Sequence, residues 1–319
     1  MNKLKNSFLI TGGTGFIGSN LVRELVKKRE RVSIIVSKNI GENSRIKDIE
    51  SKLDIYECNL LSKSLKNLVA KIKPDFIFHL ASYGVPPEED NVLEMIDINL
   101  KGTINLIEAV KQNPFKLFVN TGSCVEYGIK KDDMEETDML TPINNYGVIK
   151  SATTLYCQKE AIRNNLPIIN FRMFSAYGYF DQKYRLIPSV IRSAIMNEPI
   201  KVSAPTNVRD FIFIEDVISA YLRATEVSLP NGGIFNIGSG KQHSIEEIVK
   251  FCLGISKSNS EIQWGALSNQ KRFIEPLRWQ ADMSKTKKIL NWKPKVTIEK
   301  GLKKTVEWFK KNKDLDIYN

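Results

Sequence analysis

The sequence predicts an α/β fold in which a doubly wound parallel sheet is followed by a smaller C-terminal α/β lobe. Two observations support this prediction. Apolar runs of strand length alternate with amphipathic stretches of helical periodicity through the first half of the chain. A glycine-rich turn, Gly12 to Gly18, stands between the first apolar run and the first amphipathic stretch, where folds of this class bind phosphate groups.

The elements of the first half follow one another in regular order. Continuous apolar runs are typical of strands that are buried on both faces of a parallel sheet. The expected strands are Ser7 to Thr11, Val32 to Val36, Phe76 to Ala81, Leu117 to Thr121 and Ile168 to Met173. The expected helices between them are Phe16 to Lys28, Ser64 to Lys71, Val92 to Lys111 and Tyr146 to Arg163.

The chain becomes less regular after residue 175. Ser244 and Glu247 have the spacing of a capping box at a helix start, and Thr297 is expected to begin a last, basic helix that ends near Lys311. Two domains are expected, residues 1–174, to which 209–240 return, and a second lobe of residues 175–319. The other features expected in this lobe are a loop with Tyr177, Gly178, Tyr184 and Arg185, a helix from Ile187, and short strands near Ile200 and Phe211.

The formal charge of +11 at pH 7 restricts the partners. A basic chain can bind nucleic acid, an anionic membrane surface or a small anionic ligand. The sequence has no basic stripe interleaved with aromatic residues, and its lysines are scattered over predicted helix faces and the C-terminal segment. A solvated basic surface is therefore expected, with neither nucleic acid nor a membrane as partner.

Cysteine and histidine usage argues against a metal site. The four cysteines show no Cys-x-x-Cys spacing, and the chain has only two histidines. A reduced, cytoplasmic setting follows. The apolar run Phe8 to Ile10 is too short for a signal peptide or a membrane span, so a soluble protein is expected.

The glycine-rich turn is expected to bind the pyrophosphate of a dinucleotide. Gly12 allows a tight turn, Gly15 lets the backbone approach the phosphates, and Gly18 lets the helix pack closely on the strand. The spacing is Gly-x-x-Gly-x-x-Gly, not the commoner Gly-x-Gly-x-x-Gly, and a plain turn is the alternative. The strand before it and the apolar helix face after it favour the phosphate site, in a Rossmann-like fold.

The end of the second strand bears on the choice of cofactor. In a site specific for NAD, an acidic residue closes this strand and binds the adenosine ribose. Here the strand continues into Ser37 and Lys38, with Arg45 further along, and these residues suit a 2′-phosphate. NADP(H) is therefore favoured, although NAD(H) is not excluded, since Lys38 can also be an ordinary surface lysine.

Tyr146 and Lys150 are four residues apart on a predicted helix, so they share one face. An adjacent ammonium stabilises a tyrosine phenolate, and such a pair can exchange a proton with a carbonyl near neutral pH. Ser123 follows the fourth apolar run, at the strand end where ligands bind in such sheets, and its hydroxyl could bind the same carbonyl oxygen. The alternatives are ordinary helix surface for the pair and a loop or cap residue for Ser123.

The combined pattern resembles the extended short-chain dehydrogenase/reductases, in the branch of nucleotide-sugar epimerases, dehydratases and ketoreductases. The resemblance covers nearly the whole chain and implies a dinucleotide domain with a substrate-binding lobe. The strings that carry it are Gly12 to Gly18, Phe78-His79-Leu80-Ala81, Asn99 with Gly102-Thr103, Ser123 with Tyr127-Gly128, Tyr146 with Lys150, Arg209-Asp210-Phe211-Ile212, Phe235-Asn236-Ile237-Gly238, Ala281-Asp282-Met283-Ser284-Lys285 and Trp292-Lys293-Pro294.

The resemblance implies roles for individual residues. Ser123, Tyr146 and Lys150 would be catalytic, and Lys150 would also hold the nicotinamide ribose. The implied cofactor-binding residues are Gly12, Thr14, Gly15, Phe16, Ile17, Gly18, Ser37, Lys38, Asn59, Leu60, Leu80, Ala81, Asn99, Tyr146 and Lys150. The implied substrate-binding residues are Ser82, Ser123, Cys124, Ser175, Arg185, Arg209 and Arg272, of which Arg209 and Arg272 would contact a diphosphate.

Departures from the family pattern narrow the reaction. In the 4,6-dehydratases the hydroxyl residue is followed by Asp-Glu, whereas Cys124 and Val125 follow Ser123 here, and Glu126 stands one position too late. Related decarboxylases use a glutamate where Val125 stands. Ser175 replaces an asparagine that is common in the substrate loop, and Asn59 stands where an aspartate often meets the adenine.

We therefore expect an NADPH-dependent reductase that acts at C4 of a nucleoside-diphosphate 4-keto-6-deoxysugar, in deoxysugar biosynthesis. One alternative is an epimerase or 4-dehydrogenase that retains NAD. A remote alternative is a non-catalytic NADP-binding scaffold. The resemblance also implies a homodimer through a four-helix bundle formed by Val92 to Lys111 and Tyr146 to Arg163 of each copy.

Overall fold

The computed structural model of the protein describes residues 6–37, 45–86, 88–267 and 278–312. The chain divides into two compact units. The first unit consists of residues 1–128, 140–173 and 220–235, and the second consists of residues 129–139, 174–219 and 236–319. The chain thus leaves and re-enters each unit, and we describe the two units separately.

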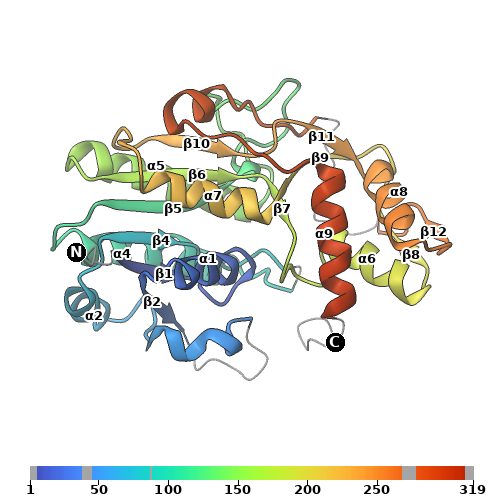
Figure 1. Cartoon of the computed structure of the whole chain (residues 1–319). Helices are drawn as coiled ribbons and strands as arrows, with labels where there is room; N and C mark the ends of the chain where they lie inside the picture. Colours follow the sequence, from blue (N-terminus) through green and yellow to red (C-terminus); the bar gives the residue numbers. More distant parts are fainter. Residues whose placement is uncertain (1–5, 38–44, 87, 268–277, 313–319) are drawn as a thin grey trace. The chain divides into compact units, whose positions relative to one another are not determined.

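The first unit is built on a seven-stranded sheet with the order β10-β6-β5-β4-β1-β2-β3 (Figure 1). Each neighbouring pair from β6 to β3 is parallel, so the predicted fold class is confirmed. The strands are β1 Ser7–Thr11, β2 Arg31–Val36, β3 Asp54–Glu57, β4 Phe76–His79, β5 Leu117–Ser123, β6 Ile168–Met173 and β10 Ile234–Ile237.

β1 and β6 have the predicted bounds, but β3 was not predicted. Its sequence, Asp54 to Glu57, has two charged ends and only two apolar residues, Ile55 and Tyr56, so it lacks the apolar run of the central strands. It lies at the edge of the sheet, where a strand needs less apolar surface.

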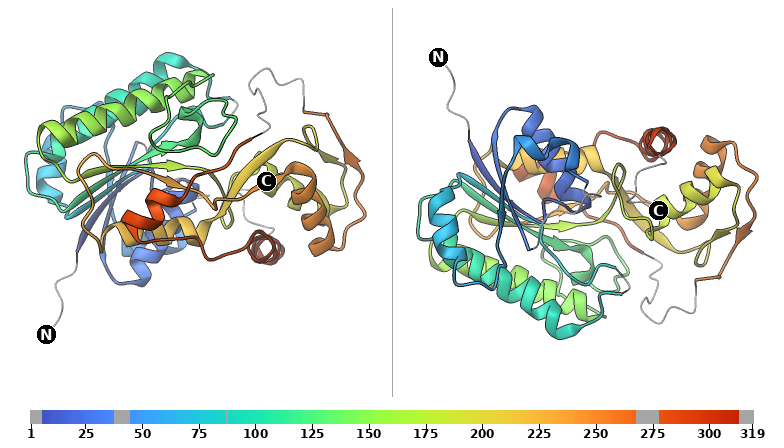
Figure 2. Two further views of the ribbon diagram at one scale, coloured as in Figure 1. Left: turned by 90° about the horizontal axis from the view of Figure 1, so that it is seen from above. Right: turned by 90° about the horizontal axis from the view of Figure 1, so that it is seen from below.

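Helices cover both faces of this sheet (Figure 2). Helix α1, Phe16–Lys27, lies on one face, and α4, Gly102–Val110, and α5, Asn145–Arg163, lie on the other. The predicted helix Val92 to Lys111 consists of three joined pieces, α3 Val92–Met95, a π-helical turn η2 Ile96–Lys101, and α4. The core of the α4 and α5 face joins strand residues to residues of these helices and of α2, Leu65–Ile72: Leu9, Ile77, Phe118, Val69, Leu106, Val110, Cys157 and Ala161.

The order of the strands reverses at β1, which pairs with β2 on one side and with β4 on the other. Ligands of doubly wound sheets bind outside the carboxyl ends of the strands at this point. The glycine turn follows β1, Leu80 to Ser82 follow β4, and Ser123 ends β5. The fold therefore brings these predicted site residues together at the carboxyl ends of the central strands.

The second unit contains a three-stranded sheet with the order β11-β9-β7 and a two-stranded sheet of β12 and β8. Its strands are β7 Ser175–Tyr177, β8 Ile200–Lys201, β9 Val208–Phe213, β11 Gln242–Ser244 and β12 Ile262–Gln263. Its helices are α6 Leu186–Met196, α8 Ile245–Ser256 and α9 Ile298–Lys311, and α7 Ile214–Ala224 passes from this unit into the first. Short helical turns are η1 Lys47–Lys52 and η3 Cys124–Glu126 in the first unit and η4 Thr286–Leu290 in the second.

Local signals in this unit are partly confirmed. Ser244 and Glu247 form the predicted capping box of α8, and the Thr297 side chain caps α9. The prediction of a loop at Tyr177 is wrong, because this residue ends β7. Its ring is buried beside Phe213, and its hydroxyl would lie 2.1 Å from a Cβ at Gly301. Packing across the unit, which no local signal carries, fixes this strand.

In the part of the chain that the structure describes, every helix is too short or too polar to cross a membrane.

Candidate active site

The glycine-rich turn folds tightly against the end of β4. Gly12 has φ +71°, and a Cβ there would lie 2.6 Å from the Ala81 nitrogen. A Cβ at Gly18 would lie 2.1 Å from the Gly12 carbonyl oxygen. The Gly15 N–H closes the turn by donating to that same oxygen over 3.1 Å. Side chains at positions 12 and 18 would therefore force the turn away from the sheet.

The start of helix α1 fits a pyrophosphate. Its N-cap is Gly15, which has no side chain, and its first turn has no acidic residue. The positive end of the helix dipole therefore lies where Thr14, Gly15, Phe16, Ile17 and Gly18 meet. This geometry supports the predicted dinucleotide site.

A buried histidine holds the neighbouring strand ends together. His79 Nδ1 lies 2.6 Å from Thr11 Oγ1, and His79 Nε2 lies 2.8 Å from Thr103 Oγ1. Thr103 donates its own proton to the Asn99 carbonyl over 2.6 Å, so His79 Nε2 carries the ring proton and Nδ1 accepts from Thr11. Burial and the nearby charge of Lys150 lower the pKa of His79 to about 3. This neutral link was not predicted from sequence.

Asn99 supports the loop after β4, beside the predicted cofactor site. Its side chain is buried, and its amide exchanges two hydrogen bonds of 2.8 Å with the backbone of Tyr83. Both ends of the amide are thus engaged with the loop after β4. That loop contains Leu80, Ala81 and Ser82, which are half-buried.

The ends of β2 and β3 carry the other predicted cofactor residues. Ser37 is exposed directly after β2, and Lys38 lies outside the described residues. Asn59 is also exposed, and its side chain accepts a hydrogen bond of 2.8 Å from the Leu61 N–H. Leu60 would lie 3.3 Å from a Cβ at Gly102. The Arg45 carbonyl accepts from Arg23, whose guanidinium also binds Asp48 and lowers the pKa of that carboxyl.

Tyr146 and Lys150 lie on successive turns at the start of α5, as predicted. The helix begins at a side-chain cap, in which Asn144 Oδ1 accepts from the Gly147 N–H over 2.7 Å. Lys150 is 5% exposed, and its Nζ lies 5.8 Å from the centre of the Tyr146 ring and donates to the Thr121 carbonyl over 2.6 Å. The Tyr146 hydroxyl lies 3.4 Å from Ser82 Oγ. The ammonium is thus fixed beneath the phenol.

Ser123 ends β5, two residues beyond the carbonyl that binds Lys150. It is paired with Met173 of β6, and its Oγ accepts a weak hydrogen bond of 3.4 Å from the Val125 N–H. A hydroxyl that accepts in this way keeps its proton for donation to a ligand oxygen. Ser123, Tyr146, Lys150 and Ser82 therefore all come from the first unit, at the carboxyl ends of β4 and β5 and the start of α5.

The remaining predicted substrate residues have varied surroundings. Cys124 is buried next to Ser123. Within the second unit, Ser175 begins β7 and Arg185 precedes α6, where it lies 3.6 Å from Asp181. Arg209 is in β9, with its guanidinium 5.2 Å from the centre of the Trp279 ring. Arg272 lies outside the described residues.

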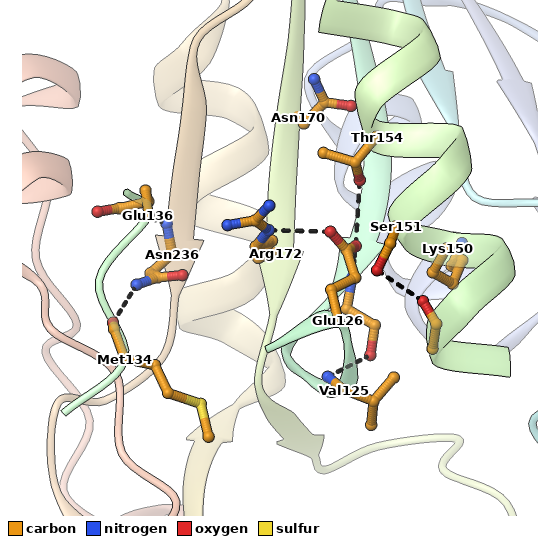
Figure 3. Close-up of polar contacts among 12 residues, drawn as sticks. Val125, Glu126, Met134, Glu136, Lys150, Ser151, Thr154, Asn170, Arg172 and Asn236 are labelled. Carbon is orange, nitrogen blue, oxygen red and sulfur yellow. Dashed lines mark hydrogen bonds and ion pairs between the residues drawn. The ribbon is translucent and has the colours of Figure 1, made fainter. Parts of the chain in front are cut away.

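Glu126 is the site residue whose role the sequence did not show. Its carboxylate accepts from the Ser123 N–H over 2.8 Å. It also accepts from Arg172 Nε over 2.9 Å, a contact drawn in Figure 3. Burial raises the pKa of Glu126, while the charge of Arg172 opposes this shift. The signal that could have identified it is the capping spacing of Ser123 and Glu126.

Sequence comparison agrees with this arrangement. The family model for the NAD dependent epimerase/dehydratase family matches residues 8–238, which include the glycine turn, Ser123, Tyr146 and Lys150. The chain belongs to this family. The resemblance to the extended dehydrogenase/reductases and their nucleotide-sugar branch is thereby confirmed.

Relatives in the family have several activities. The chain is 30% identical to the UDP-N-acetyl-alpha-D-glucosaminuronate decarboxylase of Bacillus cytotoxicus, over 96% of this chain and 98% of the relative. The solved UDP-glucose 4-epimerase of Thermotoga maritima, with UDP-glucose, is 25% identical, covers 96% of this chain and 99% of its own, and has a TM-score of 0.87. The UDP-glucuronic acid 4-epimerase of Bacillus cereus, with UDP-glucuronic acid and NAD, is 26% identical, covers 95% and 99%, and has a TM-score of 0.85.

Proposed function

We propose that the protein is an NAD-dependent enzyme that oxidises and re-reduces one carbon of a nucleoside-diphosphate sugar, as a 4-epimerase does. The observation that carries the proposal is the placement of Tyr146 over the buried ammonium of Lys150, at the strand ends next to the glycine turn. The solved 4-epimerases that match nearly the whole chain support the same reaction.

Each of these residues of the first unit has its own role in the proposed reaction. A bound nicotinamide dinucleotide supplies the acceptor and donor of hydride. As a phenolate stabilised by the Lys150 ammonium, Tyr146 accepts the proton of the sugar hydroxyl as hydride leaves, and the resulting phenol returns that proton when the carbonyl is reduced. Ser123 donates a hydrogen bond to the sugar oxygen and so stabilises the charge that develops there. Gly12 to Gly18 hold the pyrophosphate.

NAD is favoured over NADP(H) in this proposal. The Bacillus cereus epimerase was solved with NAD. The residues that follow β2 suit NADP(H), but Glu57 of β3 pairs with Val36 at the end of β2 and is exposed there. A carboxylate at this end of β3 would repel a 2′-phosphate bound after β2.

Elimination and decarboxylation fit the site less well, although one relative is a decarboxylase. The two positions after Ser123 are occupied by Cys124 and Val125, which cannot act as the carboxylic acid and base of a dehydratase. The next residue, Glu126, is 0% exposed and is bound by Arg172 and the Ser123 N–H, so its carboxylate cannot reach a ligand.

An NADPH-dependent reductase of a 4-keto-6-deoxysugar remains the second candidate. The observation that favours it is Ser37, since the described end of β2 has a hydroxyl where sites specific for NAD have a carboxylate. Such an enzyme would use the same Ser123, Tyr146 and Lys150. It would differ in releasing its oxidised cofactor after each turnover.

The first experiment identifies the cofactor and the reaction together. Nucleotide released from the purified protein by denaturation should be NAD(H), and UDP-glucose or UDP-glucuronic acid should be converted to its 4-epimer without net consumption of NAD. The epimer is measured by chromatography of the sugar nucleotides. An empty site that binds NADPH more tightly than NADH, with no epimer formed from either sugar nucleotide, would replace the epimerase by the reductase.

We also propose that two copies associate through α3 to α4 and α5. Val148, Leu155 and Ile162 on α5 are 52%, 53% and 65% exposed, and Leu93 on α3 is 69% exposed. The three α5 residues are seven apart, which places them in one stripe, as in helices that pack in bundles. A second copy related by a two-fold axis would present the same stripe and cover it.

Leu155→Glu tests this association. We expect light scattering to give the mass of a dimer for the unchanged protein and of a monomer for the variant, because a carboxylate at the centre of the stripe cannot be buried without a partner. Met139→Glu is the control, since Met139 is 78% exposed and lies outside these helices. A monomer before any substitution would contradict the proposal.

A further inference from the structure

The buried carboxylate of Glu126 is bound by three donors from three different elements. Its Oε1 accepts from the Ser123 N–H at the end of β5 over 2.8 Å and from Thr154 Oγ1 of α5 over 3.1 Å. Its Oε2 accepts from Arg172 Nε of β6 over 2.9 Å. Figure 3 shows Glu126 between Arg172 and Thr154, with α5 continuing to Lys150. The carboxylate therefore joins β5, which ends at Ser123, and the neighbouring β6 to the helix that carries Tyr146.

Both side chains of the ion pair between Glu126 and Arg172 are buried. The side chains of Glu126 and Arg172 are 0% and 2% exposed, and the Arg172 guanidinium also lies 4.6 Å from the centre of the Tyr127 ring. Taking two charges out of water is costly, and apolar residues of similar volume often stabilise a fold as well as a buried pair does. A gain in stability is therefore a poor explanation for the presence of this ion pair. The fixed geometry that the pair gives to the end of β5 is a better explanation.

The backbone next to Ser123 is shaped around the carboxylate. Gly122 pairs with Arg172 in the ladder between β5 and β6, and Ser123 pairs with Met173. A Cβ at Gly122 would lie only 2.5 Å from Glu126 Oε1. The absence of a side chain at this position is what lets the carboxylate reach the Ser123 N–H, so Gly122, Glu126 and Arg172 form one arrangement.

We propose that Glu126, held by Arg172 and Thr154, is a positioning residue that fixes Ser123 so that its hydroxyl points its proton at the reacting sugar oxygen. Glu126 touches the backbone N–H of Ser123 and not its Oγ. The carboxylate fixes the N–H, and the Val125 N–H occupies a lone pair of the hydroxyl, so one orientation of the hydroxyl proton is favoured. This inference rests on the role given to Ser123 in the proposed function.

A double-mutant cycle between Glu126→Gln and Ser123→Ala tests the proposal. The measured quantity is the rate of the first hydride transfer at saturating NAD and sugar nucleotide, followed as NADH absorbance in a single turnover. UDP-glucose or UDP-glucuronic acid is used, whichever reacts faster. We expect Glu126→Gln alone to lower this rate about tenfold or more, since small misplacements of catalytic groups have large effects on rate. In the Ser123→Ala background, Glu126→Gln should lower the rate of hydride transfer less than twofold, because the hydroxyl that Glu126 positions is already absent.

Two further variants separate positioning from folding. Gly122→Ala keeps both charges, and its Cβ would lie 2.5 Å from Glu126 Oε1, 3.1 Å from Thr154 Oγ1 and 3.3 Å from the Phe171 carbonyl oxygen, so the carboxylate must shift most and hydride transfer should be slower. Glu160→Gln removes another buried, ion-paired carboxylate of α5, bound to Lys159 and Lys111, and should change the melting temperature but not the hydride transfer.

The outcomes are distinguishable. If Ser123→Ala leaves hydride transfer unchanged, the role of Ser123 in the proposed function fails, and the role of Glu126 fails with it. If Ser123→Ala slows the reaction but the effects of Glu126→Gln are the same in both backgrounds, only the positioning role is overturned. Lower melting temperatures with unchanged hydride transfer in Glu126→Gln and Gly122→Ala would show that the pair serves the fold alone.

Discussion

Replacing Tyr146 with Phe is expected to lower the rate of sugar oxidation by about 10²-fold or more and to leave cofactor binding in place. The substitution removes only the hydroxyl, which lies 3.4 Å from Ser82 Oγ at the edge of the site. The ring remains, so the helix start at Asn144 and the Lys150 bond to Thr121 should persist. What is lost is the group that exchanges a proton with the sugar hydroxyl.

The measurement is single-turnover NADH formation together with an NAD titration of each protein. Tyr156→Phe is the matched control, because it removes a hydroxyl from the same helix at a residue that packs against the core. It should react at the unchanged rate. Normal turnover in Tyr146→Phe would remove this residue from the mechanism, and a loss of NAD binding would show that the tyrosine serves the cofactor site instead.

Gly18→Ala is expected to have the second largest effect. Its Cβ would lie 2.1 Å from the Gly12 oxygen and 2.9 Å from the Gly13 Cα, and both atoms belong to the backbone of the turn. The turn must therefore move, which should cost about 1–3 kcal/mol in the free energy of unfolding. Because the same turn presents the start of α1, we also expect NAD affinity to fall by at least about tenfold, or 1.4 kcal/mol.

Gly254→Ala provides the control for this prediction. Gly254 lies in α8, and a Cβ there has no neighbour within 4 Å. Alanine is favoured over glycine in a helix interior by up to about 1 kcal/mol, so this variant should be slightly more stable and bind NAD normally. Denaturant unfolding and NAD titration measure both effects. An unchanged NAD affinity in Gly18→Ala would show that the turn does not hold the pyrophosphate.

The central elements of the fold could be predicted because each carries its own signal. The apolar runs that became β1 and β6 are buried on both faces, so composition alone indicated them. β3 and the strand at Tyr177 escaped prediction for a different reason. Their residues are fixed by neighbours distant in the chain, such as Val36 beside Glu57 and Gly301 beside Tyr177.

The site residues likewise divide into those that the sequence could predict and one that it could not. Gly12, Ser123, Tyr146 and Lys150 could be predicted because motif spacing places them at strand ends or on one helix face. The role of Glu126 depends on Arg172, which is 46 residues away in sequence and meets it only through the pairing of β5 with β6. The capping spacing of Ser123 and Glu126 indicates the bond to the Ser123 N–H, but nothing in the sequence indicates the ion pair with Arg172.

The buried His79 simplifies how the acid–base behaviour of the enzyme is interpreted. The chain has only two histidines, and burial lowers the pKa of both, that of His79 to about 3. Imidazole ionisation in the native protein is therefore confined to the acid side of its usual range near 6.5. A break in the pH dependence of the rate on the alkaline side of neutrality can accordingly be assigned without an imidazole.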